Sequence, residues 1–269
     1  MNTTTSFPIY TVDSFTDQAM KGNPAGVCVL QNSIASEEML KIAQELNLSE
    51  TAFIYPENDV FAIRYFSPVK EIPLCGHATL AASKILIEEN GLSEARYMTK
   101  NQVSLRATKR ANQIVMEFPS YSTIPFEPSP KLIEALGIDK LHDARYNVEN
   151  NMVMLVTDEK ELIHLKPDFE ALLRSNDYIS GVLVTASSND DYDFKSRYFW
   201  PWSGGNEDPV TGATHTFMAP YWGNVLQKNT LKSFQASKRT GFMEIELERN
   251  GKIDIIGNAV VVIKGTLTL

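Results

Sequence analysis

Long apolar runs, phosphate-binding glycine loops and clustered metal ligands are all missing from this sequence. No apolar stretch is long enough to cross a bilayer, and neither a Walker-type nor a dinucleotide-binding glycine pattern occurs. The four histidines are scattered, and none has a second ligand at helical or turn spacing. We therefore expect no membrane span, no organic cofactor and no metal ion.

Cysteine and positive charge are also scarce. Cys28 and Cys75 are the only cysteines, which suits reduced thiols in a cytoplasmic protein. The net charge of −8 argues against non-specific binding to nucleic acid or to an anionic membrane. Residues 1–5 contain no basic region followed by an apolar one, so no signal peptide is expected.

What the sequence does contain is a repeated pattern. The string RYFSP at residues 64–68 returns as RYFWP at residues 197–201, and each copy precedes a turn and an apolar helix. A second echo, AxKR, occurs at residues 107–110 and 236–239, each time before a strand-like run. Ordered matches of this kind predict a duplication, two similar halves that each hold strands and one helix. The alternative is that RYFxP is merely a common string at strand ends.

A proline-rich stretch separates the two halves. Residues 119–130 carry four prolines, a composition typical of a linker. The full length of 269 residues allows two domains of ordinary size. The predicted division is 1–118 and 119–269, with the terminal strands free to cross between the lobes.

Each half has a glycine at the turn before its helix. Gly76 lies between Cys75 and His77 in the first half, and Gly212 opens the second helix. Free backbone N–H groups at such helix N-termini attract anions, which favours a small carboxylate as the substrate. A two-cysteine racemase is excluded because the second half has no cysteine. A Cys75–His77 nucleophile pair is disfavoured, since neighbours on one turn rarely face each other productively.

Three acid–base candidates lie near these turns: Glu50, His77 and Asp208. The corresponding strand of the second half, residues 179–184, has no carboxylate, so the two halves are chemically unequal. Each candidate also has a structural reading: a solvated strand end for Glu50, a packed turn histidine for His77 and a helix cap for Asp208. We expect burial and a second carboxylate to raise the pKa of Glu50.

Four sequence blocks carry a resemblance to a known family. They are GNPAG at 22–26, SETAF at 49–53, CGHAT at 75–79 and EDPVTG at 207–212. With these blocks the chain resembles the PhzF-like family of phenazine-biosynthesis isomerase-like proteins, which shares the diaminopimelate-epimerase fold. The resemblance implies an α+β fold with two pseudo-symmetric lobes. Each lobe is a curved, mostly antiparallel sheet wrapped around a central helix, and the site lies between the lobes.

The resemblance also implies isomerisation without a cofactor. In the characterised family enzyme, a glutamate moves a proton on a cyclic dihydro-hydroxyanthranilate; the matching residue here is Glu50, with His77 and Asp208 beside it. The family often has a serine at the position of Ala213, so this departure bears on the substrate. The resemblance further implies a homodimer. The implied substrate contacts are Asn23, Ser49, Gly76, Ala78, Gly212, Ala213 and Thr214.

Other functions remain open at this point. One is a non-catalytic member that uses the same site to bind a ligand or a protein. Another is a racemase or epimerase that pairs Glu50 with a different base. The presence of all three acid–base candidates favours an isomerase acting on a small cyclic or amino-acid-like carboxylate. The sequence does not specify the substrate or its pathway.

Overall fold

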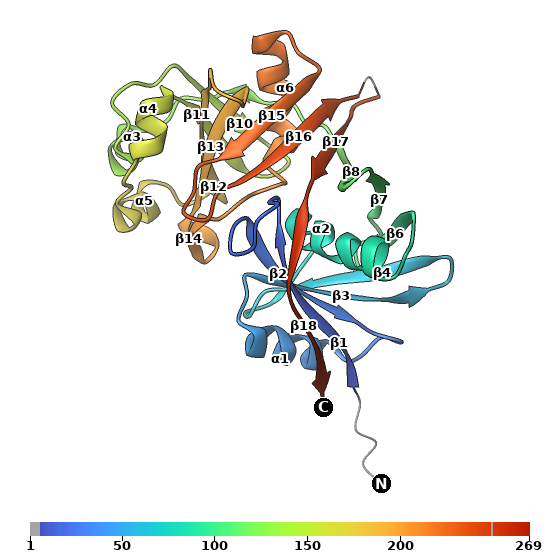
Figure 1. The fold of residues 1–269 in the computed structure, drawn as a ribbon. Helices are drawn as coiled ribbons and strands as arrows, with labels where there is room; N and C mark the ends of the chain where they lie inside the picture. Colours follow the sequence, from blue (N-terminus) through green and yellow to red (C-terminus); the bar gives the residue numbers. More distant parts are fainter. Residues whose placement is uncertain (1–5, 249) are drawn as a thin grey trace. The chain divides into compact units, whose positions relative to one another are not determined.

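The computed structural model describes residues 6–248 and 250–269 (Figure 1). Residues 1–5, on which the expectation of no signal peptide rests, lie outside this range. The chain forms two compact units, a first unit of Met1–Glu117 with Ile255–Leu269 and a second unit of Phe118–Asp254. The last strand returns to the first unit because β18 (Ala259–Thr268) pairs antiparallel with β1 (Ser6–Ser14) along almost its whole length.

The first unit is built mainly from strands. Its remaining strands are β2 (Asn23–Val29), β3 (Glu50–Glu57), β4 (Val60–Phe66), β5 (Glu71–Ile72), β6 (Glu94–Thr99), β7 (Ser104–Arg110) and β8 (Gln113–Pro119). Its helices are α1 (Ser36–Leu46) and α2 (Gly76–Lys84), and α2 continues into the π-helical turn η1 (Ile85–Glu89). β8 reaches the unit boundary, and β17 (Lys252–Gly257) spans it.

The second unit holds more helices. Its strands are β9 (Ile124–Pro125), β10 (Asp143–Asn147), β11 (Met152–Val156), β12 (Gly181–Ser187), β13 (Phe194–Trp200), β14 (Gly205–Asp208), β15 (Thr230–Gln235) and β16 (Gly241–Leu247). Its helices are α3 (Pro130–Leu136), α4 (Glu159–His164), α5 (Phe169–Ser175), the short η2 (Pro201–Ser203) and α6 (His215–Leu226).

The two units repeat one pattern of strand pairing. In the first unit β1–β2 is antiparallel, β2–β3 parallel, β3–β4 and β4–β5 antiparallel, β4–β6 parallel and β6–β7 antiparallel. In the second unit β10 to β16 follow the same succession, strand for strand. The predicted α+β fold with two similar halves is confirmed.

The RYFxP repeat marks equivalent places in the two units. Arg64 on β4 forms two hydrogen bonds with Glu71 on β5, of 2.8 and 2.9 Å, and its guanidinium lies 5.2 Å from the ring centroid of Phe66. Arg197 on β13 binds Glu207 on β14 with the same two distances. A bidentate pair of this kind fixes the angle between two neighbouring strands.

The AxKR echo does not mark equivalent places, and that interpretation is wrong. Residues 107–110 lie within β7, whereas residues 236–239 form the connection between β15 and β16. By the order of pairing, the counterpart of β7 is β16. A short string with three fixed letters therefore recurs here without a structural reason.

Each unit has a largely buried helix against its strands. Residues 76–83 of α2 are all buried, and the helix contacts β1, β2, β3 and β18. Its short side chains, such as Ala78, Ala81 and Ala82, allow close approach on every side. α6 packs against β15 and β16. In the described part of the chain, no helix is long and apolar enough to cross a membrane.

Candidate functional site

Glu50 and His77 meet inside the first unit. Glu50 is the first residue of β3, and His77 lies in the first turn of α2. Their residues are only 8% and 6% exposed, and His77 Nε2 lies 3.2 Å from Glu50 Oε2. The strand end and the helix start therefore bring together two side chains that are 27 positions apart in sequence. Neither is a solvated side chain, as the structural reading of Glu50 would require.

The other ring nitrogen of His77 has two neighbours. Asn23 Nδ2, at the start of β2, lies 3.3 Å from His77 Nδ1, and Cys75 Sγ lies 3.4 Å from the same atom. The amide nitrogen can only donate, so a neutral ring accepts at Nδ1 and carries its proton on Nε2. In the imidazolium form both ring nitrogens are protonated, and the Asn23 amide must turn its oxygen toward Nδ1 to accept from it. In both forms His77 donates a hydrogen bond to Glu50.

The main chain of His77 is held too. The hydroxyl of Ser14, the last residue of β1, donates to the carbonyl oxygen of His77 at 2.8 Å. Cys75 has an extended backbone, with φ −145° and ψ 113°, directly before the helix begins. This conformation turns the thiol toward the first turn of the helix. The expectation that Cys75 and His77 would not face each other is therefore wrong.

The electrostatics of this cluster favour a charged pair. Burial alone would raise the pKa of Glu50, but the hydrogen bond and charge of His77, helped by Ser49, outweigh it and lower that pKa. Burial alone would lower the pKa of His77, but Cys75 and Glu50 together hold it well above its ordinary value. Burial also raises the pKa of Cys75. The predicted rise in the pKa of Glu50 is thus wrong for the first unit, and Glu50 is a carboxylate at neutral pH.

Asp208 belongs to a separate cluster in the second unit. It ends β14, is 8% exposed, and accepts a hydrogen bond from the hydroxyl of Thr211. Gln235 on β15 links the two residues, because its Nε2 donates to the Asp208 carbonyl at 2.7 Å and its Oε1 accepts from Thr211 N at 2.8 Å. Sequence reasoning missed Thr211 and Gln235 as partners of Asp208. The DPVT string is the signal that could have found Thr211.

The remaining predicted contacts of the second unit surround the start of α6. Gly212 is buried and Ala213 is partly exposed. Thr214 is fully buried, and its hydroxyl donates to the carbonyl of Thr211 at 2.9 Å. That hydroxyl is used within the unit, which leaves Ala213 as the more accessible side chain of the turn.

The strand register shows which residue of the second unit occupies the position that Glu50 has in the first. Thr51 faces Phe66 across β3 and β4, and Val182 faces Phe199 across β12 and β13. The two RYF strings are thereby aligned, and the position that matches Glu50 is Gly181.

A side chain at this glycine would have no room. A Cβ on Gly181 would lie 2.3 Å from the hydroxyl oxygen of Tyr198. Asp208 faces Tyr198, and Ile72 faces Tyr65, the equivalent tyrosine of the first unit. The same alignment therefore places Asp208 at the position of Ile72. Each unit therefore has one buried acid at a place where the other unit has none.

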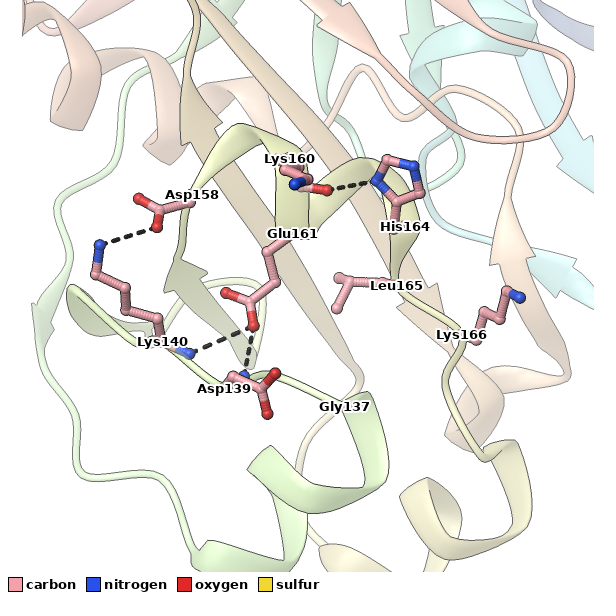
Figure 2. A pocket seen from close by; sticks show the side chains of 9 residues that line it. All are labelled: Gly137, Asp139, Lys140, Asp158, Lys160, Glu161, His164, Leu165 and Lys166. Atoms are coloured by element: carbon pink, nitrogen blue, oxygen red, sulfur yellow. Dashed lines mark hydrogen bonds and ion pairs between the residues drawn. The ribbon is translucent and has the colours of Figure 1, made fainter.

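A pocket in the second unit contains none of the predicted site residues. Figure 2 shows several of its charged side chains bound to neighbours, whereas those of Asp139 and Lys166 are drawn without a marked contact. Lys140 Nζ binds Asp158 at 2.9 Å, Glu161 accepts from the backbone N–H of Lys140 at 3.3 Å, and His164 donates to the carbonyl of Lys160 at 2.7 Å. The first two contacts tie the start of α4 to the loop before β10.

Glu50, Cys75 and His77 also form a group of possible metal ligands, which spacing along the chain did not reveal. One donor atom of each lies within 4.8 Å of the other two. Cys75 and His77 are two positions apart, and the third donor comes from a different strand. Only the fold places all three together.

Comparison with known proteins gives one consistent result. The family model described as "Phenazine biosynthesis-like protein" matches residues 12–265. A protein of Halalkalibacterium halodurans, named an uncharacterized isomerase, is 42% identical over 97% of this chain and 98% of its own length.

Solved structures agree with the sequence comparison. A PhzF-family phenazine biosynthesis protein of Enterococcus faecalis has a TM-score of 0.92 at 37% identity, covering 98% of this chain and 100% of that one. The structure of a predicted epimerase from Pseudomonas aeruginosa has a TM-score of 0.74 at 18% identity, covering 97% and 99%, and shows the shared fold alone.

Proposed function

Because the chain belongs to the phenazine biosynthesis-like (PhzC-PhzF) family, we propose that it is a cofactor-independent isomerase that moves a proton on a small cyclic or amino-acid-like carboxylate. Glu50 is the general acid/base of this proposal. The single observation that carries it is the buried contact between Glu50 Oε2 and His77 Nε2. A buried carboxylate held in place by hydrogen bonds is suited to take up a proton and release it again.

The reaction begins with Glu50 as the base. Its pKa is lowered, so the carboxylate is ionised and takes a proton from a substrate carbon. The C–H electron pair becomes part of a new double bond, and an O–H bond forms on Glu50. Glu50 then returns the proton to another carbon of the conjugated system. No electrons are gained or lost, so the step needs no oxidant or reductant.

His77 lies next to Glu50 and also controls its orientation and its protonation. Its Nε2–H holds the carboxylate in one orientation, and Asn23 and Ser14 hold His77 in turn. The hydrogen bond stabilises the ionised form and weakens as Glu50 takes up a proton. Glu50 therefore releases that proton readily in the second half of the reaction.

Asp208 is proposed as a further catalytic group, and the N–H groups of the Gly76 and Gly212 turns as the binding site for the substrate carboxylate. The substrate contacts carried over from the family are Asn23, Ser49, Ala78, Ala213 and Thr214. Of these, Asn23, Ala78 and Thr214 are fully buried, whereas Ser49 and Ala213 are partly exposed. A homodimer, which rests on the family resemblance, and a cytoplasmic location, which rests on the two free cysteines, are parts of the same proposal.

The test replaces Glu50 with Gln, which keeps size and hydrogen bonding but removes the transferable proton. With a panel of dihydroaromatic and cyclic amino-acid carboxylates, deuterium exchange into bound substrate should slow by about a hundredfold to ten-thousandfold. Ligand affinity should change little. Glu57→Gln is the matched control, since Glu57 is an exposed residue at the other end of β3. Equal exchange rates in Glu50→Gln and the parent would remove Glu50 from the reaction.

A further inference from the structure

Three different donor atoms converge at the start of α2. His77 Nε2 lies 3.2 Å from Glu50 Oε2 and 3.9 Å from Cys75 Sγ, and all three donors lie within 4.8 Å of one another. A tetrahedral zinc ion with bonds of about 2.0–2.3 Å holds its ligand atoms roughly 3.3–3.8 Å apart. Cys75 Sγ lies nearer to Nδ1 of the same ring, at 3.4 Å, so the thiol would have to shift toward Nε2 for the three side chains to bind one ion.

We propose that Glu50, Cys75 and His77 form a binding site for a thiophilic divalent cation such as Zn²⁺. Metal binding at this site is a different activity from the isomerisation proposed above, which proceeds by proton transfer at Glu50. Three protein ligands leave the fourth tetrahedral position to water or to another small ligand.

Charge and burial both suit such an ion. Binding replaces the thiol proton of Cys75, so a thiolate and a carboxylate balance the two positive charges of the metal. If His77 is protonated beforehand, it releases a second proton, because only the neutral ring is a ligand. The residues of all three ligands are at most 8% exposed, which limits competition from bulk water.

The ligand set also predicts selectivity. One sulfur, one imidazole nitrogen and one carboxylate oxygen suit Zn²⁺ and Cd²⁺. Mg²⁺ and Ca²⁺ prefer sites made entirely of oxygen ligands. We therefore expect binding of Zn²⁺ and no measurable binding of Mg²⁺ at the same concentration.

Binding would also block proton transfer under the proposed function. The ion would occupy Glu50 Oε2 and His77 Nε2, the two atoms that share the hydrogen bond in the free protein. Zn²⁺ should then inhibit deuterium exchange reversibly, and a chelator should restore it. Only this consequence rests on the proposed function, because metal binding is measured without substrate.

The experiment titrates the metal-free, full-length protein with Zn²⁺ against a chromophoric chelator, and with Co²⁺ as a spectroscopic probe. We expect one equivalent of Zn²⁺ and a thiolate-to-cobalt charge-transfer band in the parent protein. Cys75→Ala should weaken binding at least about tenfold and abolish the band, since thiolate is the preferred soft ligand. Cys28→Ala is the matched control; Cys28 is the other free, buried cysteine and should leave both readouts unchanged.

Several outcomes would overturn the site. They are equal Zn²⁺ affinity in Cys75→Ala and the parent, a missing charge-transfer band in the parent, or an equal loss in Cys28→Ala. If Cys75→Ala does not fold, His77→Gln gives a second test with the same expected loss of affinity. Zn²⁺ binding at Cys75 without loss of deuterium exchange would support the metal site and contradict the role of Glu50.

Discussion

Each unit holds one buried histidine at the start of its main buried helix, and the two histidines have opposite properties. His77 faces a carboxylate, and its pKa is raised well above the ordinary value. His215 is fully buried next to Ser233 and the carbonyl of Thr211, and burial lowers its pKa to about 4. The surroundings thus shift the pKa values of the two rings in opposite directions.

The two histidines are not counterparts in the repeat. When Gly76 is aligned with Gly212, His215 matches Thr79 instead. Thr79 Oγ1 donates to a carbonyl four residues back, and His215 Nδ1 does the same, at 2.7 and 3.0 Å. His215 thus fills a structural position of the first helical turn. The comparison teaches that the two units share a scaffold, whereas the neighbouring side chains decide in which direction the pKa of each histidine is shifted.

The largest expected effect concerns these histidines and pH. The pKa of His215 is about 4 in the folded protein, whereas that of an exposed histidine is about 6.5. The unfolded chain therefore binds an extra proton between these values, and stability falls as the pH drops through that window, by on the order of 3 kcal/mol. Urea unfolding from pH 4 to 8 should show this loss in the parent and its removal in His215→Gln.

His77 should show the opposite sign in the same experiment. Its pKa is raised in the folded protein, so the folded state binds more protons than the unfolded chain above about pH 6.5. Its contribution to stability is then complete below the unfolded pKa and is lost as the pH rises through the folded pKa. His77→Gln should flatten the alkaline side, and it should also weaken the acid-side contribution of Glu50, whose lowered pKa depends on His77. An unchanged acid slope in His215→Gln would contradict the distinction between the two rings.

A smaller effect tests why the second unit has no acid at the Glu50 position. Gly181→Ala would place a Cβ 2.3 Å from the Tyr198 hydroxyl oxygen and 2.6 Å from its ring. Overpacking of this kind should lower the free energy of unfolding by about 1–3 kcal/mol. Gly265→Ala, which adds its Cβ in open space, should change it by less than about 0.5 kcal/mol. Equal values for the two variants in urea unfolding would show that Tyr198 does not close this position.

The smallest effect tests the part of the repeat that is the same in both units. Double-mutant cycles on Arg64–Glu71 and Arg197–Glu207, with Gln at each position, should each give a coupling of about 1 kcal/mol. Because the bond lengths are identical in the two pairs, we expect the two couplings to agree within about 0.5 kcal/mol. A strong coupling in one unit and none in the other would mean that the repeat has diverged here as well.

Short strings in the sequence were sufficient to predict the scaffold and the family. RYFxP with its following turn predicted the duplication, because strand propensity and turn residues act over a few positions. The four family blocks predicted the PhzF-like family, and the comparisons confirm that prediction together with an isomerase-type enzyme. The same kind of evidence failed for AxKR, since three matching letters do not fix the register of a strand.

The sequence by itself determined two similar α+β halves, a glycine at or just before the start of each main helix, and Glu50, His77 and Asp208 as candidates. The tertiary structure decided their chemistry. It placed His77 3.2 Å from Glu50 and so reversed the expected direction of the pKa of Glu50, and it brought Cys75 to the same ring. Protonation depends on distances of a few ångströms between residues far apart in the chain, and only the packing of strand ends against a helix start sets those distances.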